Sequence, residues 1–195
     1  MKYVIRIGVF FLFVTNILLL YLLNRNERQS YIRNEVEFSR FRKLEKESAF
    51  AWGNERVRFP LDLELMTLDG KPVRLQDTLK NPAFVMWYPQ HNCTLCFRKN
   101  LDLFLDVAKS NPDAVILSTK LTVRDLFFFA KKYDISVPCF AVKDERSDYP
   151  FREYSSPLFF NLDTRGVVDR LLVHNPDFDI IAEAYFSMQK KITGD

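Results

Sequence analysis

The sequence predicts a three-layer α/β domain, in which helices flank a central mixed sheet, preceded by an apolar helix and a helical stalk. Three observations lead to this prediction. Residues 7–23 carry no charge, residues 61–65 alternate between apolar and polar side chains, and apolar runs at 83–88 and 114–117 each precede a helix signal. Half-buried strands alternate their side chains, whereas strands covered on both faces are continuously apolar, so the pattern indicates a layered α/β domain.

The first expected element is a transmembrane helix over residues 7–23 (IGVFFLFVTNILLLYLL). A helix rises about 1.5 Å per residue, so this run is near the lower limit for crossing a bilayer core. It has no polar face, which argues against a buried core helix. It also resembles the apolar part of a cleaved secretory signal, but neither a small-residue cleavage site nor a lipid-accepting Cys follows Leu23. We therefore expect residues 1–24 to be an uncleaved anchor.

Residues 25–58 are expected to form a charged stalk. No Gly or Pro lies between Asn24 and Trp52, and charges of both signs are mixed there, which is compatible with a helix. The apolar residues of this segment keep no steady heptad. A solvated spacer is therefore favoured over a dimerising coiled coil.

The folded domain is expected over residues 59–195 and begins with a β-hairpin. Leu61, Leu63 and Leu65 form the first strand, the turn lies at 69–71, and Val73 and Leu75 continue the period of two. The run at 83–88 (AFVMWY) then predicts a central strand that is covered on both faces.

The remainder of the domain is expected to add helices and strands in the order strand, helix, strand, helix, two strands, helix after the hairpin. Apolar residues at helical spacing over 97–108 predict the first helix, and Thr122 can cap the second, which reaches Tyr133. The other predicted elements are a strand within 113–118, strands at 158–163 and 167–173, and a final helix that starts at Asn175-Pro176-Asp177.

Composition excludes some classes of function. At 195 residues the chain has room for one domain of ordinary size, and 48% hydrophobic residues are enough for a real core. The net charge of +3 is small and is not concentrated in one block, so we expect no nucleic-acid partner. Three cysteines are too few for a disulfide scaffold.

Cys93 and Cys96 form a C-x-x-C motif between a predicted strand and a predicted helix. A sulfur at a helix N-terminus is stabilised as the reactive thiolate, and a second thiol one turn later can attack a mixed disulfide. The alternatives are half of a zinc site or two inert core cysteines. A zinc site needs two more ligands, and only His91, Cys139 and His174 are available, so we expect no metal and no cofactor.

Three separately placed motifs within residues 61–192 resemble the TlpA-type, membrane-anchored branch of the thioredoxin-like superfamily. They are the hairpin LELMTLDGKPVRL, the strand that ends just before C-x-x-C, and the segment SSPLFFNLDTRGVVDRLLV. The resemblance implies a thioredoxin-like fold with Cys93 as the attacking and Cys96 as the resolving cysteine. It also implies that Ser156-Pro157 is a substrate-binding segment with a cis-proline, which would keep metal from the dithiol.

The chain departs from this family at three places. Thr94-Leu95 stands between the cysteines where the family often has a Pro, and Leu158 replaces the usual Thr after the proline. Trp87 occupies the position, six residues before the first cysteine, where the family often has a buried acid or amide. The resemblance therefore assigns no general base.

Other side chains have two interpretations each. His91, two residues before Cys93, either modulates the thiol or has no role. Cys139 is expected to begin an apolar strand and to be a small buried hydrophobe, with a third redox thiol as the alternative. The rings of Phe127, Phe128 and Phe129 either extend the core or include a partner surface.

The favoured function is a thiol–disulfide oxidoreductase that reduces or exchanges protein disulfides and contributes to cell redox homeostasis. Its expected partners are a protein disulfide or thiol substrate and a redox partner protein. One alternative is an antioxidant thiol peroxidase, because Pro89-x-x-x-Cys93-x-x-Cys96 resembles a peroxiredoxin motif in which Cys96 would react with peroxide. That site also needs an arginine, for which Arg146, Arg165 and Arg170 are candidates. The other alternative is a binding or redox-sensing module without catalysis.

The membrane orientation follows from two opposing arguments. More Lys and Arg residues lie just after the apolar run than before it, which on a bare count places the domain in the cytoplasm. Long domains translocate regardless of charge, however, and a tethered dithiol is most useful in an oxidising compartment. We therefore expect a single-pass protein with its C-terminal domain on the periplasmic side.

Overall fold

A computed structural model describes the backbone of most of the chain. The described residues are 2–79, 81–89, 94–119, 121–143, 150–151, 154, 156–173, 175 and 179–193, without the side chains of 2–14, 94–97 and 193. Contacts divide the chain into two compact units, Met1–Lys46 and Glu47–Asp195.

The first unit is part of a single helix, α1, which runs over Lys2–Asn54. Residues 25–54 are thus helical, as expected for the stalk. Among the residues whose side chains are described, no helix is both long and apolar enough to cross a bilayer. The expected span over 7–23 includes residues 7–14, whose side chains are not described, so the anchor stays a prediction.

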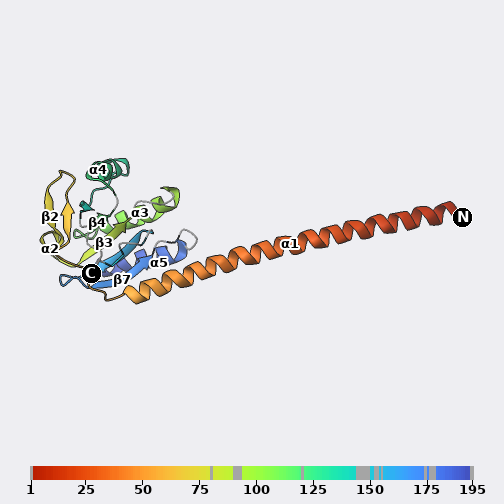
Figure 1. Ribbon diagram of the computed structural model, residues 1–195, viewed down its shortest axis with the longest axis horizontal. Coiled ribbons are helices and arrows are strands. Elements are labelled where there is room, and N and C mark those ends of the chain that lie inside the picture. Colours follow the sequence, from red (N-terminus) through yellow and green to blue (C-terminus); the bar gives the residue numbers. More distant parts are fainter. Residues whose placement is uncertain are drawn as a thin grey trace. The chain divides into compact units, whose positions relative to one another are not determined.

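The second unit contains a seven-stranded mixed sheet in the order β2-β1-β5-β4-β3-β6-β7 (Figure 1). Strands β3, β4 and β5 are parallel, and the other neighbouring pairs are antiparallel. The strands are β1 (Glu64–Met66), β2 (Pro72–Arg74), β3 (Ala83–Tyr88), β4 (Val115–Ser118), β5 (Cys139–Val142), β6 (Leu158–Leu162) and β7 (Val168–Val173).

The expected hairpin and the two closing strands are confirmed, with two differences in the hairpin. Its first strand begins at Glu64, so Leu61 and Leu63 lie before it. Leu75 does not extend its second strand but begins a short helix, α2 (Leu75–Thr78). The apolar strand expected to begin at Cys139 is confirmed as β5, which the expected order left out and which lies between β4 and β1.

Three longer helices complete the unit: α3 (Thr94–Ala108), α4 (Val123–Lys132) and α5 (Asp179–Thr193). The expected start of α4 is confirmed, because the Thr122 hydroxyl accepts a hydrogen bond of 3.1 Å from the backbone N–H of Asp125. Helices α3 and α5 lie against each other and are linked by ion pairs at both ends. Near one end, Lys99 Nζ lies 2.9 Å from Asp179 and 2.8 Å from Glu183.

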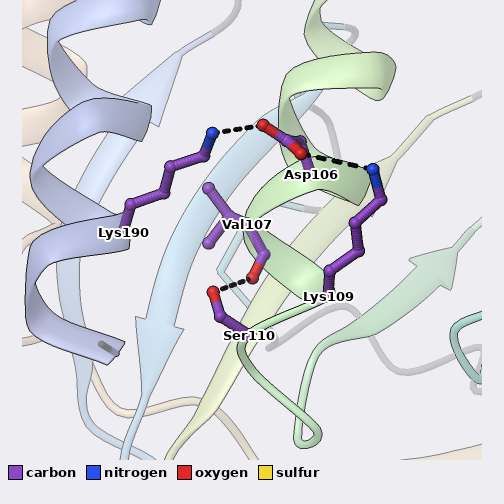
Figure 2. Close-up of polar contacts among 5 residues, drawn as sticks. All are labelled: Asp106, Val107, Lys109, Ser110 and Lys190. Carbon is purple, nitrogen blue, oxygen red and sulfur yellow. Dashed lines mark hydrogen bonds and ion pairs between the residues drawn. The ribbon is translucent and has the colours of Figure 1, made fainter. Parts of the chain in front are cut away.

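At the other end of this helix pair, Asp106 of α3 accepts hydrogen bonds from Lys190 of α5 and from Lys109 (Figure 2). The hydrogen bond from Lys190, followed by that from Lys109, holds the pKa of Asp106 below its ordinary value. All three side chains are substantially exposed, so these pairs align the helices more than they stabilise the fold.

The side chains of β3 alternate between two hydrophobic clusters, as expected for a strand covered on both faces. Phe84 and Met86 pack in a cluster with residues of α3, α4 and α5. Val85 and Trp87 pack in a second cluster, which is completed by irregular segments, α2 and the end of α1. Helices α3, α4 and α5 thus cover one face of the sheet, whereas irregular segments, α2 and the end of α1 cover the other.

The last turns of α1 belong to this second cluster. The Phe50 ring stacks on Tyr154 with 4.1 Å between ring centroids and lies 6.0 Å from Phe151. One turn earlier, the buried carboxylate of Glu47 accepts a hydrogen bond from the buried side-chain amide of Asn175. The folded unit therefore includes residues that precede the expected domain start at Phe59.

Candidate active site

The connection between β3 and α3, which contains Cys93 in the sequence, leaves β3 at the carboxyl edge of the parallel strands. Tyr88, the last residue of β3, pairs with Ser118, the last residue of β4. Buried Pro89 follows, and α3 begins at Thr94, the residue after Cys93. Cys93 and His91 lie outside the described residues, and only the backbone of Cys96 is described, in the first turn of α3. The predicted order of strand, dithiol and helix is thus consistent with the elements on either side.

Pro157 lies at the same edge. It is buried and directly precedes β6, whose first residue, Leu158, pairs with Trp87 near the end of β3. Ser156 beside it is half-buried. The topology therefore brings this segment close to the strand that leads into the motif, although sequence separation gave no direct indication of it.

The isomer expected at Pro157 is wrong. No peptide bond among the described residues is cis, so the bond between Ser156 and Pro157 is trans. Trans is the intrinsically favoured isomer before proline, and the cis expectation came from the family resemblance alone. The place of Pro157 beside β3 does not depend on the isomer.

Two buried hydroxyl groups at this edge were missed by sequence reasoning. Within the described part of the chain, Ser118 Oγ and Thr119 Oγ1 are buried and have no hydrogen-bond partner. Buried hydroxyls are nearly always bonded, so such a pair calls for an explanation. The available signal was a polar Ser-Thr pair that ends the apolar run of 114–117.

Aromatic rings cover one side of the edge. The ring of Tyr88 stacks on Phe129 of α4 with 4.8 Å between centroids. Burial, with a smaller contribution from Tyr133, raises the pKa of Tyr88. The Tyr88 hydroxyl is therefore neutral at physiological pH and supplies a polar group without adding charge.

Glu47 and Asn175 are the second pair that sequence reasoning missed. Asn175 follows β7, whose last residue, Val173, pairs with Leu158 at the carboxyl edge. Glu47 lies within the charged stalk sequence, where no pattern distinguishes a buried carboxylate from exposed ones. Burial and the charge of Glu47 raise the pKa of Tyr154 to about 12.

Cys139 is a buried free thiol, which confirms the expected core role of this side chain. Its Sγ lies 3.4 Å from the backbone carbonyl oxygen of Val137. Burial raises the pKa of the Cys139 thiol to about 12, so almost no thiolate forms at neutral pH.

Two of the three candidate arginines lie away from this edge. Arg165 bonds the Asp163 carboxylate at 2.9 and 2.8 Å in the turn after β6, beside the start of β3. Arg170 lies in the edge strand β7, with its Nε 3.5 Å from Asp169. Arg146 lies outside the described residues.

No three His, Cys, Asp or Glu side chains are placed to hold a metal ion within the described part of the chain. The potential ligands Cys93, His91 and His174 are not in that part.

Comparisons with known proteins identify the fold. No family model and no curated protein sequence matches this chain. Among solved structures, peroxiredoxin Q from Xanthomonas campestris is similar, with a TM-score of 0.53 and 18% identity over 72% of this chain and 99% of its own. A thiol:disulfide interchange protein from Bacteroides sp. has a TM-score of 0.51 and 17% identity over 66% of this chain and 88% of its own.

A third structure, the bacterioferritin comigratory protein of Xanthomonas campestris, has a TM-score of 0.51 and 18% identity over 71% of this chain and 99% of its own. Identities this low establish the fold alone. The second unit has a thioredoxin-like α/β fold with a mixed sheet.

Proposed function

We propose that this chain is a membrane-anchored thiol–disulfide oxidoreductase in which Cys93 and Cys96 exchange disulfides with a protein substrate. The observation that carries the proposal is that β3 ends at the carboxyl edge of a thioredoxin-like sheet and α3 begins at Thr94, the residue that follows Cys93 in the sequence. A helix N-terminus favours a thiolate there. The similar structure of a thiol:disulfide interchange protein supports this choice.

The reaction uses both cysteines in turn. The Cys93 thiolate attacks one sulfur of a substrate disulfide, a Cys93–substrate bond forms, and the other substrate sulfur leaves as a thiolate that takes up a proton. Deprotonated Cys96 then attacks the Cys93 sulfur, so the intramolecular disulfide forms and the second substrate thiol is released. The substrate has gained two electrons, and a dithiol of a redox partner protein restores the Cys93–Cys96 dithiol and is itself oxidised to a disulfide.

Ser156-Pro157 is the proposed substrate-binding segment. Its position next to the end of β3 supports this, because an extended substrate strand that binds there would lie close to the motif. Proline donates no backbone hydrogen bond, so pairing with substrate would use the flanking backbone groups. Because a protein substrate would bind along this segment and a small disulfide would not, substitution of Pro157 should raise the KM for a protein disulfide more than the KM for a small disulfide.

The decisive test is a redox titration of the full chain with a Cys139→Ser substitution, against glutathione or dithiothreitol, with the Cys93–Cys96 disulfide followed by mass. A reversible two-electron couple is expected. A potential near about −270 mV would assign a reductant and one near about −120 mV an oxidant. If no intramolecular disulfide forms at any potential, thiol–disulfide exchange by this pair is ruled out. A couple without turnover of any protein disulfide would instead favour a redox-sensing module.

A thiol peroxidase is the second candidate. The similar structure of peroxiredoxin Q and the spacing Pro89-x-x-x-Cys93-x-x-Cys96 support it, with Cys96 as the peroxide-reactive sulfur. Single variants separate the two candidates. A Cys96→Ser chain that traps substrate through Cys93 supports disulfide exchange, whereas a Cys93→Ser chain that still consumes peroxide supports the peroxidase.

We further propose that residues 7–23 anchor the chain in a membrane with the folded unit on the periplasmic side. The uncharged run of the sequence supports the anchor. Resistance of the full chain to alkaline extraction from membranes tests the anchor. Labelling of intact cells with a membrane-impermeant maleimide, in variants with an exposed surface cysteine, tests the side.

A further inference from the structure

Helix α4 presents two adjacent phenylalanine rings to solvent. Phe127 is 47% exposed and Phe128 54% exposed, and their ring centroids lie 5.8 Å apart. The helix packs on the sheet through Leu126 and Ala130, which are buried. These two rings therefore do not serve the core, and Phe129 is the ring of this trio that packs inward, against Tyr88.

Exposed basic side chains flank the two rings on the same helix face. The Arg124 guanidinium lies 5.8 Å from the centre of the Phe128 ring, and Lys131 follows one turn after Phe127 and Phe128. Residues three and four apart lie side by side on a helix, so Arg124, the rings and Lys131 form one stripe, with Lys132 next to it. Asp125, the acid of this helix, accepts a hydrogen bond from the Thr122 hydroxyl at the helix start.

A second exposed apolar pair has the opposite charge around it. Ile180 and Ile181 of α5 are exposed, but the flanking charges are Asp179 and Glu183, both of which pair with Lys99. The two apolar pairs therefore differ in the sign of the charge beside them. Of these two pairs, the one on α4 is complementary to an anionic surface.

We propose that the α4 stripe, defined as Arg124, Phe127, Phe128, Lys131 and Lys132, binds the surface of an anionic bilayer. The rings enter the boundary between headgroups and acyl chains, and the basic side chains lie at the lipid phosphates. A few such groups bind weakly when free in solution, but tethering a chain to the same membrane raises the local concentration of lipid. This inference rests on the proposed membrane anchor for that tethering, but it goes beyond the proposed redox function and does not depend on the dithiol.

The test places a tryptophan in the stripe of the full chain. Phe128→Trp is made together with Trp52→Phe, which leaves buried Trp87 as the other fluorophore. The chain is mixed with vesicles of brominated phosphatidylcholine, with or without phosphatidylglycerol, and flotation reports whether it binds. Quenching should be several-fold stronger with phosphatidylglycerol and should fall when Arg124, Lys131 and Lys132 are changed to Gln.

The matched control is Ile180→Trp in the same background, which should show little quenching on either lipid. Phe127→Trp is the second probe if Phe128→Trp disturbs the fold. Equal quenching at positions 128 and 180, equal quenching without anionic lipid, or failure to float with anionic vesicles would each overturn the proposal. One further pair of results would overturn it: the tryptophan at position 128 is not quenched, and a separate Phe127→Ser/Phe128→Ser variant loses exchange with a protein disulfide. The stripe would then bind a protein.

Discussion

Asn175 donates a hydrogen bond through its side-chain amide to the carboxylate of Glu47, 128 residues earlier in the chain, and both side chains are buried. Together with the stack of Phe50 on Tyr154, this bond attaches the last turns of α1 to the cluster beneath β3. The end of the helix that continues from the stalk is therefore a structural part of the folded unit, and not only a linker.

Glu47→Ala should lower the free energy of unfolding of this unit by about 1–3 kcal/mol, because it removes the acceptor of a buried hydrogen bond. Urea denaturation followed by tryptophan fluorescence measures the change. Glu45→Ala is the matched control, since Glu45 lies in the same helix but is exposed, and it should change stability little. Equal effects of the two substitutions would mean that the bond to Asn175 contributes nothing.

A fragment that begins at Glu47 should be more stable than one that begins at Phe59. The shorter fragment loses the partly buried Phe50 ring as well as the Glu47 carboxylate, so we expect a difference of about 2–4 kcal/mol. The two denaturation midpoints provide the measurement. Coincident midpoints would show that residues 47–58 are dispensable for the fold.

Local patterns predicted the elements whose signals are local. The continuous apolar run of β3 and the Thr122 cap of α4 are each contained within a few residues, and both are confirmed. The strand β5 begins at Cys139 as expected, but its four residues follow Pro138 in a short and interrupted pattern, and the expected order of elements left it out. The burial of Glu47 could not be predicted, because it depends on a contact with Asn175 that only the tertiary fold creates.

The candidate site divides in the same way. The expected place of Cys93 and Cys96 near the junction of a strand and a helix followed from periodicity on both sides of the motif. The place of Pro157 beside β3 required the family resemblance, and the same resemblance gave the wrong isomer. That the buried Ser118 hydroxyl has no hydrogen-bond partner among the described residues is apparent only when the surrounding packing is known.

Gly166→Ala should destabilise the domain strongly. The residue has φ of +79°, and a Cβ built there would lie 2.5 Å from the backbone oxygen of Phe59. Phe59 cannot easily move away, because its backbone N–H donates a hydrogen bond of 2.6 Å to the carbonyl oxygen of Gly166. We expect a loss of about 1–3 kcal/mol from the backbone conformation, plus the cost of the contact. Thermal denaturation measures it.

Gly70→Ala provides the control for that substitution. Gly70 has φ of +76°, but nothing lies within 4 Å of an added Cβ. It should therefore show the conformational cost alone, and the difference between the two variants isolates the contact with Phe59. If Gly70→Ala were as costly as Gly166→Ala, that contact would have no measurable effect.

Cys139 should resist alkylation at pH 8 in the folded protein. Its pKa of about 12 means that its neutral form predominates up to strongly alkaline pH, and its burial excludes the reagent. Iodoacetamide labelling of the reduced chain, read by mass, should therefore modify Cys93 and Cys96 and spare Cys139 until the protein is unfolded by urea. Equal labelling of all three thiols in the native state would contradict the buried position of Cys139.

Ser118→Ala should raise the free energy of unfolding by about 1–2 kcal/mol, because it removes a buried hydroxyl that has no partner among the described residues while keeping the Cβ. Ser110→Ala is the contrasting variant: the Ser110 hydroxyl donates a 2.9 Å hydrogen bond to the carbonyl oxygen of Val107 (Figure 2), so its removal should cost about 0.5–1.5 kcal/mol. Urea denaturation gives both values.

If Ser118→Ala is instead destabilising, a buried water bonds this hydroxyl in solution. If the variant is more stable but exchanges disulfides more slowly, the hydroxyl is retained for the chemistry at the carboxyl edge, where Ser118 pairs with the last residue of β3.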